Sequence, residues 1–411
     1  MTPLLDIDFV RARFPAFAEP ALQGQAFFDN AGGSYTCKPV IDRLMRFYHS
    51  RKVQPYGAYE ASRLGGQEMD EARERLAAMM GVETDELSFG PSTTANTYVL
   101  AQAFGEMLDA GAAIIVTDQD HEANSGPWRR LAARGIEIRE WKIDPETGHL
   151  DPQALWALID ANVRLVCFPH CSNVVGEVNP VAGICARLRA HGVYSCVDGV
   201  SYAPHGLPDV GALGADIYLL SAYKTYGPHQ GLMVIRRDLA EALPNQAHYF
   251  NAGVPYKRFT PAGPDHAQVA ACAGMADYVD ALHAHHFAGG TGRSPAQRAA
   301  AVHDLMRAHE TRLLERLLGH LRGRNDIRVL GPVAAEARAP TVAIAHRQPG
   351  HVLAEALAGR GIMAGGGSFY ADRALAAQGI VPGHGVLRLS FVHYTSEDEL
   401  DRLCDALDRV L

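Results

Sequence analysis

The stretch Ser221-Ala222-Tyr223-Lys224-Thr225-Tyr226-Gly227-Pro228-His229-Gln230-Gly231 comes directly after an apolar run that ends at Leu220. The run, residues 216–220, is typical of a buried strand, so the stretch predicts a turn at the carboxyl end of that strand. A lysine crowded in such a turn loses its proton easily through desolvation and can attack a carbonyl to form a Schiff base. A solvated loop lysine is the alternative, because most lysines are surface charges.

Short apolar runs alternate with helical patterns on both sides of this stretch, from residue 86 to about residue 236. The runs lie at 87–89, 112–117, 136–141, 163–169, 193–197, 217–220 and 232–235. Strands that alternate with helices predict the α/β class, with a mostly parallel seven-stranded sheet covered by helices on both faces. Ligands of such sheets bind at the carboxyl ends of the strands.

The whole chain divides into three predicted parts: an N-terminal arm at 1–35, a large α/β domain at 36–290, and a helix plus a smaller α+β C-terminal domain at 291–411. Long helices rich in alanine and leucine are expected over 268–286 and 295–322, joined by a glycine-rich loop at 289–293. Ser396 and Glu399 form a capping box that predicts the start of the last helix.

The composition limits the kind of partner. The 411 residues carry a formal net charge of -8 and no run of lysine or arginine, so we expect no nucleic-acid partner. The seven cysteines are an odd number and stand mostly in apolar runs, which is typical of buried thiols in a reducing cytoplasm. No apolar run reaches 18 residues and no signal segment is visible, so we expect a cytoplasmic protein without a membrane segment.

A phosphate site is predicted where Gly90-Pro91-Ser92-Thr93-Thr94 follows one strand and opens a helix. Free backbone amides, the positive helix end and the hydroxyls of Ser92, Thr93 and Thr94 would converge on one dianionic group. Plain N-capping of the helix by Ser92 or Thr93 is the alternative.

Three more polar side chains follow predicted strands. His121 could stack on an aromatic ring, and Asn173 could donate to a phenolic oxygen. Asp198 could pair with a protonated pyridine nitrogen, because a buried carboxylate needs a cationic partner. Such a pair keeps the ring an electron sink, so these residues and Lys224 supply what a pyridoxal phosphate site needs. A loop histidine and a turn asparagine without any function are the alternatives.

Arg388 interrupts the apolar strand pattern of Leu387-Arg388-Leu389-Ser390-Phe391. A guanidinium is the cation best shaped to hold a carboxylate through two hydrogen bonds. An edge-strand arginine that faces water is the alternative. The histidines at 283, 285 and 286 have no carboxylate or cysteine at matching spacing, so we predict no metal site.

The order of these motifs resembles class V aminotransferases, and most of all the group of cysteine desulfurases and selenocysteine lyases. The resemblance covers nearly the whole chain and rests on Phe28-Asp29-Asn30-Ala31, Ser92-Thr93-Thr94, Asp120-His121, Ser172-Asn173, Val197-Asp198-Gly199, Ser221-Ala222-Tyr223-Lys224 and Arg388-Leu389-Ser390. It implies a fold type I pyridoxal phosphate enzyme that acts on a small amino acid substrate as a homodimer with shared active sites.

The resemblance also implies a role for each matching residue. Lys224 would form the Schiff base, Asp198 would face the pyridine nitrogen, and His121 would stack on the ring. Asn173 would meet the phenolic oxygen, and Arg388 would bind the substrate α-carboxylate. Thr94, Ser221 and Tyr223 would hold the phosphate, and the remaining expected cofactor contacts are Ser92, Thr93, Ser201 and Gly263. The other expected substrate contacts are Asn30, Ala31, Tyr56, Tyr59 and Tyr370.

The substrate side of the site departs from the desulfurase pattern. Desulfurases carry a nucleophilic cysteine on a loop before the final strand, where this chain reads Gly365-Gly366-Gly367-Ser368-Phe369-Tyr370-Ala371. Tyr370 falls at the position of the cysteine and Gly365 at that of an arginine, and no cysteine lies within thirty residues of Tyr370. In addition, Ser201 replaces a glutamine, Tyr223 a histidine, and Gly263 a threonine that reaches the partner's phosphate.

The sequence therefore predicts a pyridoxal phosphate enzyme that acts on an amino acid through an external aldimine, with Lys224 moving the α-proton. We favour a lyase of the β-elimination, carbon–sulfur type, because the desulfurase frame persists without the persulfide cysteine. The alternatives are an aminotransferase or epimerase, a true cysteine desulfurase that uses another thiol, and a non-catalytic protein that only binds the cofactor.

Overall fold

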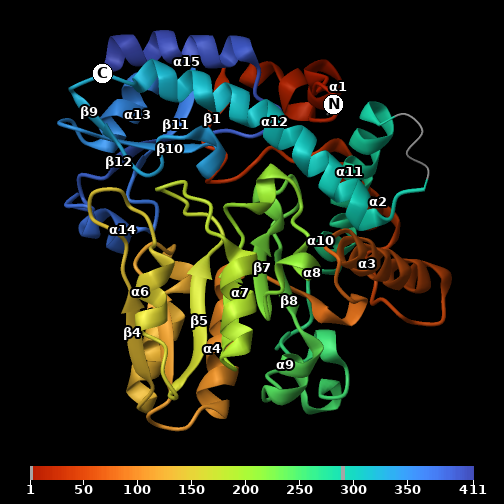
Figure 1. Ribbon diagram of the computed structural model, residues 1–411. Coiled ribbons are helices and arrows are strands. Elements are labelled where there is room, and N and C mark those ends of the chain that lie inside the picture. Colours follow the sequence, from red (N-terminus) through yellow and green to blue (C-terminus); the bar gives the residue numbers. More distant parts are fainter. Residues whose placement is uncertain (1–2, 288–291) are drawn as a thin grey trace.

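The computed structural model describes residues 3–287 and 292–411. Figure 1 shows a large sheet in the lower half, a smaller sheet in the upper half, and the long helix α12 (Pro295–Leu321) beside both. The predicted boundary at 290–291 and part of the loop predicted at 289–293 lie outside the described residues. No described helix is both long and apolar enough to cross a membrane.

The large sheet has seven strands in the order β2-β8-β7-β6-β5-β3-β4, which confirms the predicted α/β sheet. Only β8 runs antiparallel to its neighbours; all other pairs are parallel. The strands are β2 (Leu87–Gly90), β3 (Ala113–Thr117), β4 (Glu137–Trp141), β5 (Val163–Pro169), β6 (Tyr194–Asp198), β7 (Ile217–Ser221) and β8 (Gly231–Ile235).

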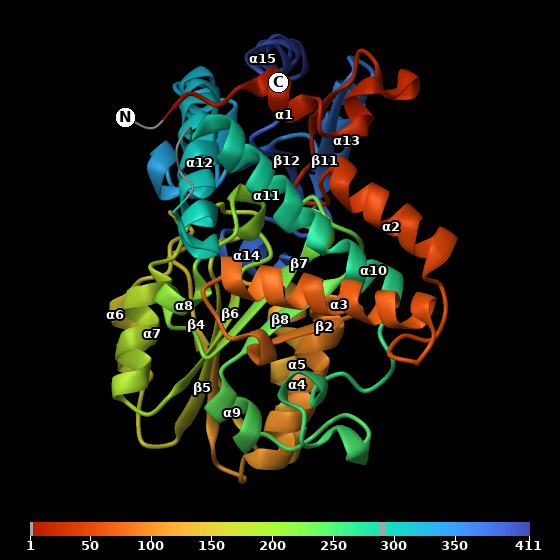
Figure 2. The ribbon, with the colours of Figure 1, turned by 90° about the vertical axis from the view of Figure 1, so that its right-hand side faces the viewer.

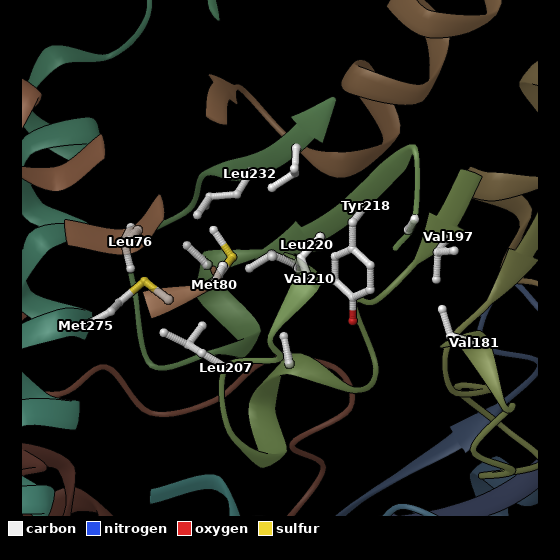
Figure 3. Packing of buried hydrophobic residues seen from close by; sticks show 14 of the residues in the cluster. Leu76, Met80, Val181, Val197, Leu207, Val210, Tyr218, Leu220, Leu232 and Met275 are labelled. Atoms are coloured by element: carbon white, nitrogen blue, oxygen red, sulfur yellow. The ribbon is translucent and has the colours of Figure 1, made fainter. Parts of the chain in front are cut away.

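Helices cover both faces of this sheet because the buried side chains of its strands alternate. Ile217 and Leu219 of β7 pack in one cluster with α4, α5 and α9, whereas Tyr218 and Leu220 pack in the other. That second cluster includes α3, α7, α10 and α11, and Figure 3 shows part of it. The helices are α2 (Lys38–Ser50), α3 (Glu60–Met79), α4 (Thr93–Met107), α5 (Gly126–Arg129), α6 (Pro152–Ala157), α7 (Val181–Ala190), α8 (Val210–Leu213), α9 (Arg237–Ala242), α10 (His266–Ala271) and α11 (Ala273–His286).

The small sheet has the order β1-β11-β12-β10-β9 and carries the C-terminal part of the chain. Its edge strand β1 comes from the predicted N-terminal arm and pairs in parallel with β11. The arm also contains the short helix α1 (Ile7–Arg11), and both elements are too short to show a period in the sequence. The other elements are β1 (Ala26–Phe28), β9 (Ile327–Val329), β10 (Thr341–His346), α13 (Gly350–Ala358), β11 (Ile362–Gly367), α14 (Asp372–Ala377), β12 (Val386–Ser390) and α15 (Glu397–Val410).

The helix α12 joins the two halves, because its first part packs in the core of the large sheet and its last part in the core of the small one. Val302 and Met306 belong to the former, and Leu313 and Leu317 to the latter. Figure 2 shows α12 next to α11, with α2, α3 and α10 along the same side of the molecule.

One predicted helix differs in the structure, because the helix expected over 268–286 is divided at Cys272 into α10 and α11. The strand β11 continues through the three glycines at 365–367. Position 366 requires a glycine, because α13 passes so close that a Cβ there would lie 2.2 Å from the Gly350 carbonyl oxygen. The capping box of Ser396 and Glu399 is confirmed.

The side chain of Leu76 offers a test of the core in Figure 3, because it is fully buried between α3 and the sheet. We expect Leu76→Ala to lower the free energy of unfolding by about 2–5 kcal/mol, through lost burial and the cavity left behind. Denaturant unfolding of the purified protein measures the change. Met45→Ala is the control, because Met45 is half exposed and should change stability little; equal effects at both positions would contradict this packing.

Candidate active site

A cavity of about 290 Å³ lies at the carboxyl ends of β5, β6 and β7, the sheet edge at which the sequence predicted a ligand. Most of the residues predicted to contact a cofactor line it. The lining residues are Ser92, Thr93, Thr94, His121, Ala123, Pro169, Cys171, Asn173, Asp198, Val200, Ser201, Ser221, Tyr223, Lys224 and His229.

Lys224 stands in a short 3-10 turn, residues 222–224, that follows β7 immediately. Its side chain is buried, and this desolvation lowers the pKa of the amine to about 8, with a further lowering by Arg388. Asp198 and Asp29 oppose the shift in this pKa. The uncharged amine, which a nucleophilic or basic lysine requires, is therefore far more abundant near neutral pH than in an ordinary exposed lysine.

The segment that follows β1 forms hydrogen bonds to the backbone of the lysine turn. The Ser34 hydroxyl donates to the Lys224 carbonyl at 2.7 Å, and the Ser34 amide donates to the Tyr223 carbonyl at 3.1 Å. A Cβ at Gly33 would lie 3.5 Å from the Tyr223 ring, an ordinary van der Waals distance. The segment after β1 therefore packs directly against the lysine turn.

The start of α4 faces the cavity with hydroxyl groups and free backbone amides. Ser92 caps the helix by accepting from the Ala95 amide at 3.1 Å, so the predicted capping is present. The Thr93 and Ser221 hydroxyls lie 2.8 Å apart beside it, and Thr94 also faces the cavity. Hydroxyls and the positive end of a helix of 15 residues converge here, an arrangement that fits a phosphate group.

Asp198, the last residue of β6, is buried in the cavity wall. Its Oδ1 atom accepts from the Val200 amide at 2.8 Å, while among the described residues its Oδ2 atom accepts no hydrogen bond. Desolvation raises the pKa of this carboxyl group, and Lys224 counteracts part of the rise. A second cation, such as a protonated ring nitrogen, would stabilise the carboxylate and fits this position.

His121 forms another wall as a neutral ring. Its Nδ1 atom accepts from the Ala123 amide at 3.0 Å, which leaves the proton on Nε2. Desolvation lowers the pKa of His121 to about 4, helped by the positive charges of Lys224 and Arg388. An uncharged imidazole in this place suits stacking on a flat ring.

Asn173 lines the cavity and also binds the neighbouring loop. Its amide nitrogen donates to the Phe369 carbonyl at 2.9 Å, while its buried Oδ1 atom has no partner among the described residues. The structure therefore brings Asn173 to the cavity and directs one of its two N–H donors to the loop that precedes α14, while its contact with a phenolic oxygen stays a prediction.

Arg388 is buried in β12, between β11 and β10, so the alternative of an edge-strand arginine that faces water is excluded. Its Nη2 atom lies 2.9 Å from Asp29 Oδ1, and its Nη1 atom donates to the Asn173 carbonyl at 3.3 Å. The guanidinium carbon also lies 3.7 Å from the centre of the Phe369 ring. Arg388 is not one of the residues that line the cavity.

Several predicted residues do not reach the cavity of their own chain. Tyr56 and Tyr59 are more than half exposed, and the Tyr56 hydroxyl donates to Asp70 at 3.0 Å. Gly263 lines a separate cavity with Phe89 and Thr260. Contacts of these three residues with a partner's site stay a prediction.

Asn30 and Ala31, the two predicted residues after β1, are not among the residues that line the cavity. The side-chain amide of Asn30 donates to the Ser390 carbonyl at 3.3 Å, and the Ala31 amide donates to the Ser390 hydroxyl at 2.9 Å. These contacts fasten β1 to β12, and the contact of Asn30 and Ala31 with a substrate stays a prediction.

Tyr370 lies at the entrance, three-quarters exposed, with its ring 5.2 Å from the His121 ring. It lines an outer cavity of about 640 Å³ that shares Thr94, His121, Ala123 and Tyr223 with the inner one. The remaining residues of this outer cavity are Tyr98, Glu122, Gly126, Pro127, Arg129, Arg130 and Arg373. A substrate side chain can therefore extend outward past Tyr370.

Sequence reasoning missed some residues of the site. The His229 ring stacks on Tyr223 at 4.9 Å, and its place five residues after Lys224 was the available signal. Asp29 stands within the Phe28–Ala31 motif without an assigned role, and Phe369 is next to Tyr370. Cys171 and Val200 stand directly beside the motifs Ser172-Asn173 and Val197-Asp198-Gly199, and this adjacency was the available signal.

Comparison with known proteins places this geometry in a family. The sequence matches the family described as aminotransferase class-V over residues 26–283 and 299–403. An aminotransferase-like protein of Gibberella zeae is 32% identical over 98% of both chains. A cysteine desulfurase of Serratia proteamaculans is 35% identical over 67% of this chain and 72% of its own.

Solved structures agree with the fold. A cysteine desulfurase from Thermococcus onnurineus superposes with a TM-score of 0.84 at 23% identity, over 98% of both chains. The cysteine desulfurase CsdA of Escherichia coli gives a TM-score of 0.81 at 22% identity, over 99% of this chain and 98% of that one. The fold is therefore fold type I of pyridoxal phosphate enzymes, and the chain belongs to the class V aminotransferases, whose cofactor is pyridoxal 5'-phosphate.

Proposed function

We propose that this enzyme is a lyase that eliminates a substituent from the β-carbon of an amino acid, with carbon–sulfur bonds as the expected class. The observation that carries the proposal is a cavity that combines Lys224 and Asp198 with no reactive thiol. In the overall reaction the bonds Cα–H and Cβ–X break, and water then releases a 2-keto acid and ammonia beside HX.

The residues of the cavity would have separate roles in holding the cofactor and in moving the proton. The hydroxyls of Thr93, Thr94 and Ser221, with the start of α4, would hold the phosphate of the cofactor, and Asp198 would pair with its ring nitrogen. When bound, the cofactor supplies an electron sink for the substrate's α-carbon. Lys224 would form the Schiff base that carries the cofactor and then, as a free amine, remove the α-proton.

The thiol content of the site argues against a desulfurase. Cys171 is the only cysteine that lines the inner cavity, and its Sγ atom lies 3.4 Å from the Gly176 carbonyl oxygen. Burial raises the pKa of the Cys171 thiol to about 12, so little nucleophilic thiolate is present. Of the other six cysteines, five are buried elsewhere and Cys404 lies in α15.

The loop that carries Tyr370 also differs from a mobile sulfur carrier. The Glu122 amide donates to the Tyr370 carbonyl at 2.8 Å, and Asn173 holds the carbonyl of the preceding residue. Two hydrogen bonds to backbone carbonyls of the loop therefore fix it against the wall of the cavity. A phenol in this position cannot accept sulfur as a persulfide.

Aminotransferase activity is the second candidate, because a relative that matches this chain from end to end is named aminotransferase-like. The same Lys224, Asp198 and Arg388 would serve it. An epimerase has no comparable support, because neither relative named above is an epimerase. A non-catalytic binding protein is disfavoured, because binding alone needs neither a buried amine nor a buried arginine.

We also propose a homodimer with shared sites in the cytoplasm. The tyrosines at 56 and 59, together with Tyr249 and Phe250, are large exposed side chains of the kind that interfaces cover. All seven cysteines are free, as is typical of a reducing compartment.

The products of the reaction distinguish the candidates. A panel of amino acids with leaving groups on the β-carbon, cysteine included, should yield 2-keto acid and ammonia in equal amounts without an added keto acid. Cys171→Ser should keep the rate within about twofold, because the thiol plays no part. A strict need for a keto acid acceptor would favour the aminotransferase, and loss of sulfide release in Cys171→Ser would favour the desulfurase.

The pKa of Lys224 predicts how cofactor uptake depends on pH. In cofactor-free protein, the rate at which the absorbance of the lysine-bound cofactor appears should rise with pH and level off above about 8, because the amine is then neutral. The same cofactor with a free lysine derivative should react faster up to about pH 10. Lys224→Ala should give a folded protein without this absorbance; a retained band would assign the amine elsewhere.

Arg388→Ala tests the carboxylate site. We expect KM for the amino acid to rise by roughly tenfold to a thousandfold, about 1.4–4 kcal/mol, because a charged hydrogen-bonding partner is lost. Arg347→Ala is the matched control, because that arginine is exposed on the small half of the molecule. An unchanged KM in Arg388→Ala would mean that another group holds the carboxylate.

A further inference from the structure

Arg388 already holds a carboxylate of its own chain. Its Nη2 atom lies 2.9 Å from Asp29 Oδ1, and its Nη1 atom donates to the Asn173 carbonyl. The Phe369 ring covers one face of the guanidinium, so an incoming anion has to approach an edge. The Nε atom is buried and has no partner among the described residues.

The carboxylate of Asp29 is held by this one contact. The neighbouring backbone is fixed, since the Asn30 amide donates to the Ser390 carbonyl at 3.2 Å. The Asp29 side chain, however, is 36% exposed, and among the described residues its Oδ2 atom accepts no hydrogen bond. Asp120 shows the opposite case, because it is buried and accepts from the side chains of Thr117 and Asn124. Asp29 can therefore turn away without disturbing its backbone.

Two glycines, Gly32 and Gly365, leave space for the Asp29 carboxylate. Gly365 pairs with Arg388 across β11 and β12, and a Cβ there would lie 2.9 Å from Asp29 Oδ1 and 2.8 Å from the Phe369 ring. A Cβ at Gly32 would lie 3.2 Å from Asp29 Oδ2. A side chain at position 365 would thus compete for the space that Asp29 and Phe369 occupy around the guanidinium.

We propose that Asp29 is an internal carboxylate that occupies Arg388 in the substrate-free enzyme and yields it to the α-carboxylate of the substrate. The identity of the arriving group rests on the proposed amino acid chemistry, whereas the exchange of carboxylates does not. One guanidinium edge cannot bind two carboxylates with full hydrogen bonding, so the incoming anion has to displace Asp29. Asp29 is therefore a positioning residue that sets the affinity for carboxylates.

The proposal predicts that a weaker internal partner strengthens the binding of external carboxylates. Asp29→Asn keeps the shape but removes the negative charge, so an anion no longer has to replace a charged hydrogen bond. We expect propionate to bind the holoenzyme of this variant roughly threefold to thirtyfold more tightly than it binds the unchanged holoenzyme.

The measurement is a propionate titration of the holoenzymes, followed by the rise in Tm at constant ionic strength with chloride as the reference anion. Asp29→Glu should behave like the unchanged enzyme, because it restores the carboxylate. Asp42→Asn is the matched control for charge, since Asp42 pairs with Lys38 on the surface. Arg388→Gln added to Asp29→Asn should remove the gain in affinity.

Unchanged or weaker propionate binding by Asp29→Asn overturns the proposal, because Asp29 would then only orient Arg388. If Asp29→Asn does not fold or does not retain the cofactor absorbance, propionate binding is measured with Asp29→Ser instead. Tighter binding by Asp29→Ser then supports the proposal, and unchanged or weaker binding overturns it. Turnover of amino acids by the unchanged enzyme is assayed separately. Tighter propionate binding without any turnover would support the exchange of carboxylates and refute the proposed lyase.

Discussion

The site depends on the burial of one amine and one carboxylate at adjacent strand ends. Burial lowers the pKa of Lys224 and raises that of Asp198, and each of the two groups opposes the other's shift. Desolvation thus makes the amine reactive, while the nearby opposite charge keeps the carboxylate available for a cationic ring. Parallel β6 and β7 make this arrangement possible, because both end at the same edge of the sheet and direct their next residues into one cavity.

The second half of the molecule has to hold Arg388 at a fixed place relative to this pair, and buried polar contacts at the junction do so. Glu310 of α12 is completely buried and binds His205 of the large half at 3.0 Å. Close by, the Tyr278 hydroxyl of α11 lies 2.6 Å from Nε2 of His393, which follows β12. Loss of one partner would leave a buried polar group unsatisfied, so these contacts oppose sliding of the two halves. The position of Arg388 is therefore a property of the junction as much as of β12.

The sequence predicted what depends on local order along the chain and missed what depends on contact between distant segments. The sheet, the Lys224 turn and the start of α4 follow from apolar periods and from the residues directly after them. By contrast, β1 has three residues and gains its place only by pairing with β11, more than 330 residues later. Asn173 was predicted as a site residue and lines the cavity, but its contact with the Phe369 carbonyl is one that no spacing indicates. For the same reason the pairing of Asp29 with Arg388 was not foreseen, although both residues were quoted in motifs.

The turn at Phe369 and Tyr370 links the loop at 365–371, which departs from the desulfurase pattern, to the rest of the site. Both residues have φ of 56°, a left-handed conformation that costs a non-glycine residue about 1–3 kcal/mol. Contacts offset this cost: Asn173 and the Glu122 amide bind the two carbonyls, and Arg388 lies over the Phe369 ring. The same contacts bring Phe369 against the guanidinium and place the phenol at the entrance. A loop bound in this way gains a rigid carboxylate site and loses the freedom that a sulfur-carrying cysteine needs. Its geometry therefore agrees with chemistry that is completed inside the cavity.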